Sequence, residues 1–104
     1  MKITRHNFIH ATANAMELES TTKLFNADPE AFDMFSLFSY AIFQIIEGKN
    51  LTEDEYAEHV TNFTSQLVSD TSTPRSGLLK TLALLIFSMQ IWNELEKMEN
   101  HKST

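Results

Sequence analysis

Two histidines stand at the spacing that would let them bind one metal ion together. His6 and His10 are four residues apart, so on a helix both would project from one face. A zinc site needs three or four protein ligands. Glu17 lies two turns further along at an unfavourable angle, His59 falls on another predicted helix, and the chain has no cysteine. We therefore predict no metal site.

Acidic residues would support acid–base catalysis only if two of them met around a substrate. Asp33 lies in a phenylalanine-rich segment, but it falls in the polar stripe of its predicted helix and no second acid evidently pairs with it. Glu53, Asp54 and Glu55 form a cluster that is typical of a helix N-terminus. No serine sits in a nucleophile elbow, and two glycines cannot build a phosphate-binding loop. We predict a protein that is not an enzyme, with no catalytic residue and no cofactor.

The charge balance bears on the kind of partner. Fourteen Asp and Glu face eight Lys and Arg, which gives a net charge of −6 that repels nucleic-acid phosphates. The first residues lack the apolar segment and small-residue cleavage site of a secretory signal. No segment reaches the ~20 apolar residues of a membrane span. We expect a cytoplasmic protein that binds neither nucleic acid nor membrane.

The apolar residues recur at helical spacing along most of the chain. Eight Phe against two Gly and two Pro, in 104 residues, favour long helices with few breaks. We predict one all-α domain over residues 1–104 with a frayed polar tail at 100–104. The second and fourth helices should be the most buried, in a compact bundle of four helices over about residues 4–25, 29–47, 52–69 and 74–99.

Local signals place several helix ends. Asp28 is a candidate N-cap, with Pro29 at the first helical position. Gly48 is placed to end the second helix in a left-handed conformation. Thr52 and Glu55 have the spacing of a capping box, in which each side chain binds the other residue's backbone N–H. These signals predict where the second helix begins and ends and where the third begins.

The fourth predicted helix is apolar on two faces. We assign one face to the core, namely Leu78, Leu82, Leu85, Met89 and Trp92. The opposite face carries Leu84, Phe87 and Ile91, bracketed along the axis by Lys80 and Glu94. In a four-helix monomer every helix keeps one face in water. One of these two faces should therefore be exposed unless another protein covers it, or unless the other three helices wrap this helix.

Contiguous exposed apolar patches mark binding surfaces, so we predict a protein interface on this helix. Its residues are Lys80, Leu84, Phe87, Ile91 and Glu94. The predicted function is a non-enzymatic protein–protein interaction module, a small accessory or regulatory protein of bacterial or phage type, acting as a homodimer or with another protein. One alternative is an immunity or antitoxin-like inhibitor that presents Glu53, Glu55 and Glu58 to a basic target. A less favoured alternative is a small-ligand-binding bundle with an aromatic cavity between the second and fourth helices.

Overall fold

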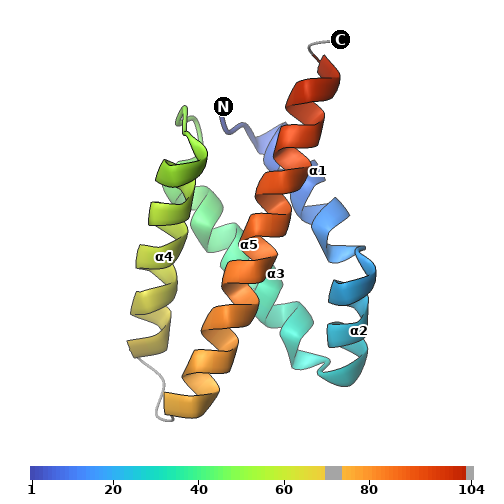
Figure 1. The fold of residues 1–104 in the computed structure, drawn as a ribbon, viewed down its shortest axis with the longest axis vertical. Helices are drawn as coiled ribbons and strands as arrows, with labels where there is room; N and C mark the ends of the chain where they lie inside the picture. The colour runs from blue at the N-terminus through green and yellow to red at the C-terminus, as the bar shows by residue number, and fades with distance from the viewer. Residues whose placement is uncertain (70–73, 103–104) are drawn as a thin grey trace.

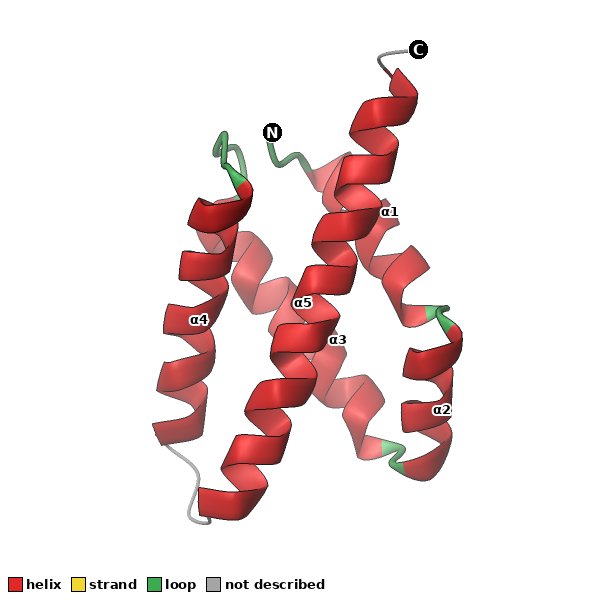
Figure 2. Cartoon of the chain, in the orientation of Figure 1, coloured by secondary structure: helices red, strands yellow, loops and turns green. Residues whose placement is uncertain are grey.

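The computed structural model confirms the all-α fold, but it has five helices in its described part where four are predicted (Figures 1 and 2). It describes the backbone of residues 1–69 and 74–102, and the side chains of these residues except 67–69, 74–78, 80 and 101–102. The helices are α1 (Arg5–Met16), α2 (Glu19–Ala27), α3 (Glu30–Ile46), α4 (Glu53–Ser69) and α5 (Pro74–Lys102).

The first predicted helix, over residues 4–25, is in fact two helices. α1 ends at Met16, Leu18 takes an extended conformation with ψ 145°, and α2 begins at Glu19. No glycine or proline marks this break. The tertiary contacts of α2 account for it, because the change of direction lets Phe25 pack edge-on against Phe35 of α3, with ring centroids 5.4 Å apart. Thr21 is buried on the side of α2 that faces α5.

α5 is the central helix of the fold (Figure 1). It packs chiefly against α1 on one side and α4 on the other, and α3 crosses behind it. Among the described residues, α3 and α5 contribute six and five buried apolar side chains, against three from α1 and two from α4. The Cα atoms span 46 × 27 × 18 Å. Because one helix with its side chains is about 10–12 Å across, the molecule is only two helix layers thick.

The helix ends follow the local signals closely. The Thr52 N–H donates to Glu55 Oε1 at 3.0 Å and the Glu55 N–H donates to Thr52 Oγ1 at 3.2 Å, which confirms the capping box. Gly48 has a φ of 79°, which confirms the left-handed end of α3. Asp28 Oδ1 accepts from the Glu30 N–H at 3.2 Å, but α3 begins one residue later than predicted, so its N-cap is Pro29 and the assignment of Asp28 as N-cap is wrong. α5 continues to Lys102, past the predicted end at residue 99.

The first residues of the chain form a contact that the sequence does not predict. They run antiparallel to the segment between α3 and α4, with a bridge between Lys2 and Asn50. The Ile3 N–H donates to the Lys49 carbonyl at 2.9 Å, and the Gly48 N–H donates to the Ile3 carbonyl at 2.8 Å. The Ile3 side chain is fully buried. This pairing fixes the start of α1 beside the end of α3.

Candidate protein-interaction surfaces

The three apolar residues of the predicted interface lie in the core. Leu84, Phe87 and Ile91 are 2%, 1% and 0% exposed in the single chain, and the Phe87 ring stacks on Phe35 with centroids 4.5 Å apart. They therefore do not form an exposed interface centre, and the prediction is wrong for them. The side chain of Lys80 lies outside the described residues. Glu94 is partly buried and accepts from Lys97 Nζ at 2.8 Å.

The buried face of α5 also holds a polar residue, so it does not read in the sequence as a purely apolar core face. Ser88 is fully buried, and its Oγ donates to the Leu84 carbonyl at 2.7 Å. The Tyr56 hydroxyl donates to the Ser88 carbonyl at 3.0 Å from α4. Burial raises the pKa of this hydroxyl above the usual tyrosine value. Over the described part of α5, no buried side-chain polar atom lacks a hydrogen-bond partner, so this face is compatible with the core despite the serine.

The opposite face of α5 is the exposed one. Leu79, Leu82 and Ile86 are 61%, 50% and 60% exposed and recur at the i, i+3, i+7 spacing of one helical face. We call these three residues the α5 stripe. Leu82 is predicted to lie in the core, and that assignment is wrong, whereas Trp92 is buried as predicted. The surplus apolar surface on this helix is therefore present, but on the side opposite to the predicted one.

A small groove between α2 and α5 adjoins the α5 stripe. It encloses about 170 Å³, and Ile86 and Leu24 are among its lining residues. At its polar side, Thr21 Oγ1 donates to Gln90 Oε1 at 3.2 Å, and Gln90 Nε2 donates to Ser20 Oγ at 3.3 Å.

A larger groove separates α1 from α3 and encloses about 470 Å³. Its lining includes Phe8 and Phe43, whose rings stack with centroids 5.3 Å apart. Two further lining residues, Ile9 on α1 and Tyr40 on α3, are 57% and 68% exposed. Arg5 also lines it, and its guanidinium lies 3.8 Å from the Glu47 carboxylate in a largely exposed ion pair. We call this feature the α1/α3 groove.

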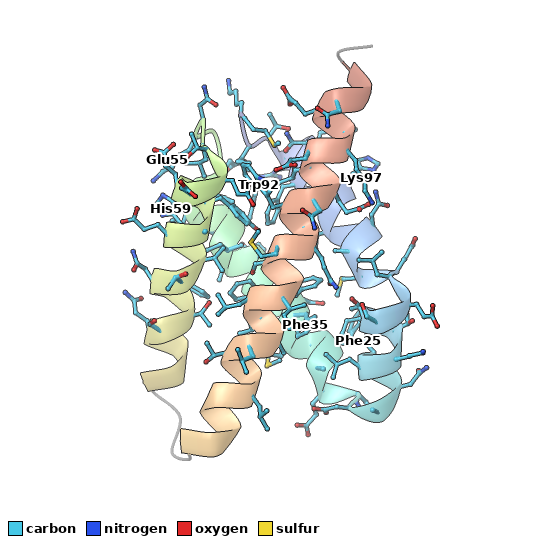
Figure 3. All side chains as sticks on the ribbon, viewed as in Figure 1. Phe25, Phe35, Glu55, His59, Trp92 and Lys97 are labelled. Carbon is cyan, nitrogen blue, oxygen red and sulfur yellow. The ribbon has the colours of Figure 1, made fainter. Side chains whose placement is uncertain are left out.

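Aromatic rings fill the contact between α3 and α5, where the ligand-binding alternative places its cavity. Phe35 stacks on Phe87, and Phe25, which lies close to Phe35 in Figure 3, meets it edge-on. Such offset and edge-on pairs are the usual packing of aromatic cores. The aromatic residues at this contact serve as core packing.

The residues with candidate chemistry are dispersed. The rings of His6 and His10 lie 4.5 Å apart on the exposed side of α1, but no group of three or more His, Cys, Asp or Glu that could hold a metal occurs among the described residues. Asp33 is exposed. The Thr52 backbone N–H, followed by its hydroxyl, lowers the pKa of the Glu55 carboxyl, which is engaged in the cap of α4.

None of the helices, over the residues described, is long and apolar enough to cross a membrane. Comparison with protein families, curated proteins and solved structures found no match.

Proposed function

We propose that this protein is a non-enzymatic protein-binding module, a small accessory or regulatory protein that docks on another protein through the α5 stripe. The observation that carries the proposal is the exposure of Leu79, Leu82 and Ile86, each at least half exposed on one face of the central helix. Single exposed apolar residues are ordinary, but an aligned set of three large ones marks a binding surface.

The spacing of the stripe suits a partner that packs along α5. Apolar residues at i, i+3 and i+7 are the anchors by which a helix enters a groove or packs on another helix. Burial of the exposed part of each side chain would contribute about 1–2 kcal/mol. Because the opposite face of α5 holds Phe87 and Ile91 in the core, the stripe is held in place before binding. That preorganisation lowers the entropy cost of association.

The rest of the surface constrains the partner by charge. The chain carries a net charge of −6, which favours a partner whose contact rim is neutral or basic. We place the interaction in the cytoplasm, without nucleic acid, membrane or metal.

A photo-crosslinking amino acid in place of Ile86 tests the proposal in cells of the source organism. The matched control carries the same group in place of Asn62, an exposed polar residue of α4. We expect a discrete cross-linked species from position 86 that is missing from position 62. Leu82→Glu, introduced beside the cross-linker, should abolish the species while circular dichroism shows an unchanged helix content. Equal labelling from both positions would contradict a binding role for the stripe.

A further inference from the structure

α2 is held to the rest of the fold by few contacts. It has nine residues and lies at one edge of the molecule (Figure 1). None of its large apolar side chains is buried: Leu24 and Phe25 are half-buried, and Thr21 is the one buried residue. By comparison, α1 has four buried residues and α3 has seven. Isolated helices shorter than about 12–15 residues are marginal in water, so α2 depends on these few contacts.

The ends of α2 add little to its stability. α1 and α4 begin with capping boxes, whereas Leu18, the N-cap of α2, makes no side-chain hydrogen bond to the helix. The two residues that flank the helix, Leu18 and Asp28, are both extended, with ψ 145° and 90°. Residues at the ends of an element are where a change in φ and ψ can move the whole element as a unit.

Among the described residues, two side-chain hydrogen bonds connect α2 to α5, and both use Gln90. Thr21 Oγ1 donates to Gln90 Oε1 at 3.2 Å, and Gln90 Nε2 donates to Ser20 Oγ at 3.3 Å. Both are longer than the roughly 2.7–3.0 Å that is most common for such bonds. The second is exposed, so water competes for its groups. The link between the two helices is therefore weak.

α2 covers aromatic core residues beside the α5 stripe. Thr21 and Leu24 line the groove between α2 and α5 together with Phe35, Phe87 and Ile86, and Ile86 belongs to the stripe. Phe35 and Phe87 are 2% and 1% exposed. If α2 moved away, the stacked pair would be uncovered on this side. The apolar surface of the stripe would then continue onto the aromatic pair.

We propose that α2 is a cover that opens while the other four helices stay folded, and that its opening adds the Phe35–Phe87 pair to the binding surface of the α5 stripe. Local opening of a weakly held segment costs less free energy than global unfolding. A partner that also reaches Phe87 binds the open form alone, so the small open fraction lowers its apparent affinity. α2 is then an autoinhibitory element. Its role in binding rests on the proposed function, whereas the opening itself does not.

Hydrogen exchange of the unchanged full chain, followed by mass spectrometry at low urea concentrations, is the first test. We expect the hydrogen-bonded amides of α2 to exchange at least about 100-fold faster, relative to their intrinsic rates, than those of α1 and α3. The rate should change little with urea, because the opening of one short helix exposes little surface. Equal protection of α2 and its neighbours, with the same dependence on urea, would overturn the proposal.

The second test uses two matched cysteines, since the chain has none of its own. Thr21→Cys and Ser88→Cys each replace a buried hydroxyl residue, on α2 and on the central helix, which are 3% and 0% exposed. A thiol reagent should label Thr21→Cys at least about 30-fold faster at low urea, because only that position is reached by local opening. Equal labelling with the same dependence on urea would contradict a separate opening of α2. Hydrogen exchange of the unchanged chain controls for the hydrogen bond that Thr21→Cys removes.

The third test releases the link between α2 and α5. Gln90→Ala removes both hydrogen bonds and should raise the exchange rate of α2 amides about tenfold while those of α3 stay unchanged, with Asn93→Ala, an exposed residue of α5, as the control. With the photo-crosslinker at position 86, Gln90→Ala should also raise the yield of the cross-linked species. An unchanged yield from a chain whose α2 exchanges faster would overturn the role of α2 as a cover. If position 86 captures nothing, the proposed function and the binding role of α2 fail together, whereas the opening of α2 is decided by hydrogen exchange alone.

Discussion

The sharpest prediction concerns Phe87 and Leu82, because the sequence and the structure assign them opposite roles. The structure buries Phe87 at 1% exposure against Phe35 and leaves Leu82 50% exposed. Sequence reasoning places Leu82 in the core and Phe87 at an interface. The two assignments therefore predict different losses in the free energy of unfolding when each residue is truncated to alanine in the isolated chain.

The expected magnitudes differ several-fold. Phe→Ala in a core costs about 3–5 kcal/mol, which includes the cavity and the lost ring contact. A domain of 104 residues is stable by about 5–15 kcal/mol, so Phe87→Ala removes between a fifth and all of it. Leu82→Ala removes methyl groups that are already half in water and leaves no cavity. Its cost should be about 1 kcal/mol or less, since alanine also has the higher helix propensity.

Thermal unfolding followed by circular dichroism at two protein concentrations measures both effects. We expect Phe87→Ala to lower the thermal midpoint by about 15–30 °C and Leu82→Ala by less than about 8 °C. Phe87→Leu, which keeps an apolar side chain, should recover part of the loss. If Leu82→Ala cost more than Phe87→Ala, the orientation of α5 would be wrong and the predicted interface face would be the outer one.

Three further predictions concern local interactions. Thr52→Ala removes a cap hydrogen bond of α4 and should lower the free energy of unfolding by about 1 kcal/mol in urea titrations, with Thr61→Ala as an exposed control. Tyr56→Phe removes the hydroxyl that binds the Ser88 carbonyl and should cost about 0.5–1.5 kcal/mol near neutral pH. The pKa of Tyr56 is raised in the folded state, so above about pH 10 the tyrosine of the unfolded chain ionises first and the wild type should lose stability. Tyr56→Phe should lose less stability over the same pH range. Equal slopes of unfolding free energy against pH for the two proteins would contradict this. The pKa of Glu55 is lowered in the folded state, so the stability that its carboxylate contributes is present above pH 4.5 and is lost as the pH falls below that value. Glu55→Gln should therefore make the free energy of unfolding depend less on pH in this acid range. An unchanged dependence would show that the cap does not need the carboxylate.

The parts of the fold that the sequence predicts well depend on residues within one turn of each other. The capping box of Thr52 and Glu55 and the left-handed Gly48 need no knowledge of the rest of the chain. The break between α1 and α2 could not be predicted in this way, since it arises from the packing of Phe25 against α3. The burial of Ile3 likewise depends on a pairing with residues more than forty positions away.

The predicted interface on α5 was wrong for a different reason. An apolar moment predicts a core face only when the other face is polar, and α5 is apolar on both. The inner face also carries Ser88, whose hydroxyl binds the backbone of its own helix. The prediction that α5 carries more apolar surface than the core buries is therefore correct, and the prediction of which face points inward is wrong.

The thickness of the molecule explains why a central helix still has an outer face. With a shortest extent of 18 Å, the fold has two helix layers, and each helix has one neighbouring layer and one side toward solvent. α5 lies between α1 and α4 and over α3, yet the α5 stripe remains uncovered. The alternative in which the other helices wrap α5 on all sides would require a third layer. In a two-layer fold α5 therefore keeps an outer face, and in this structure that face carries the α5 stripe.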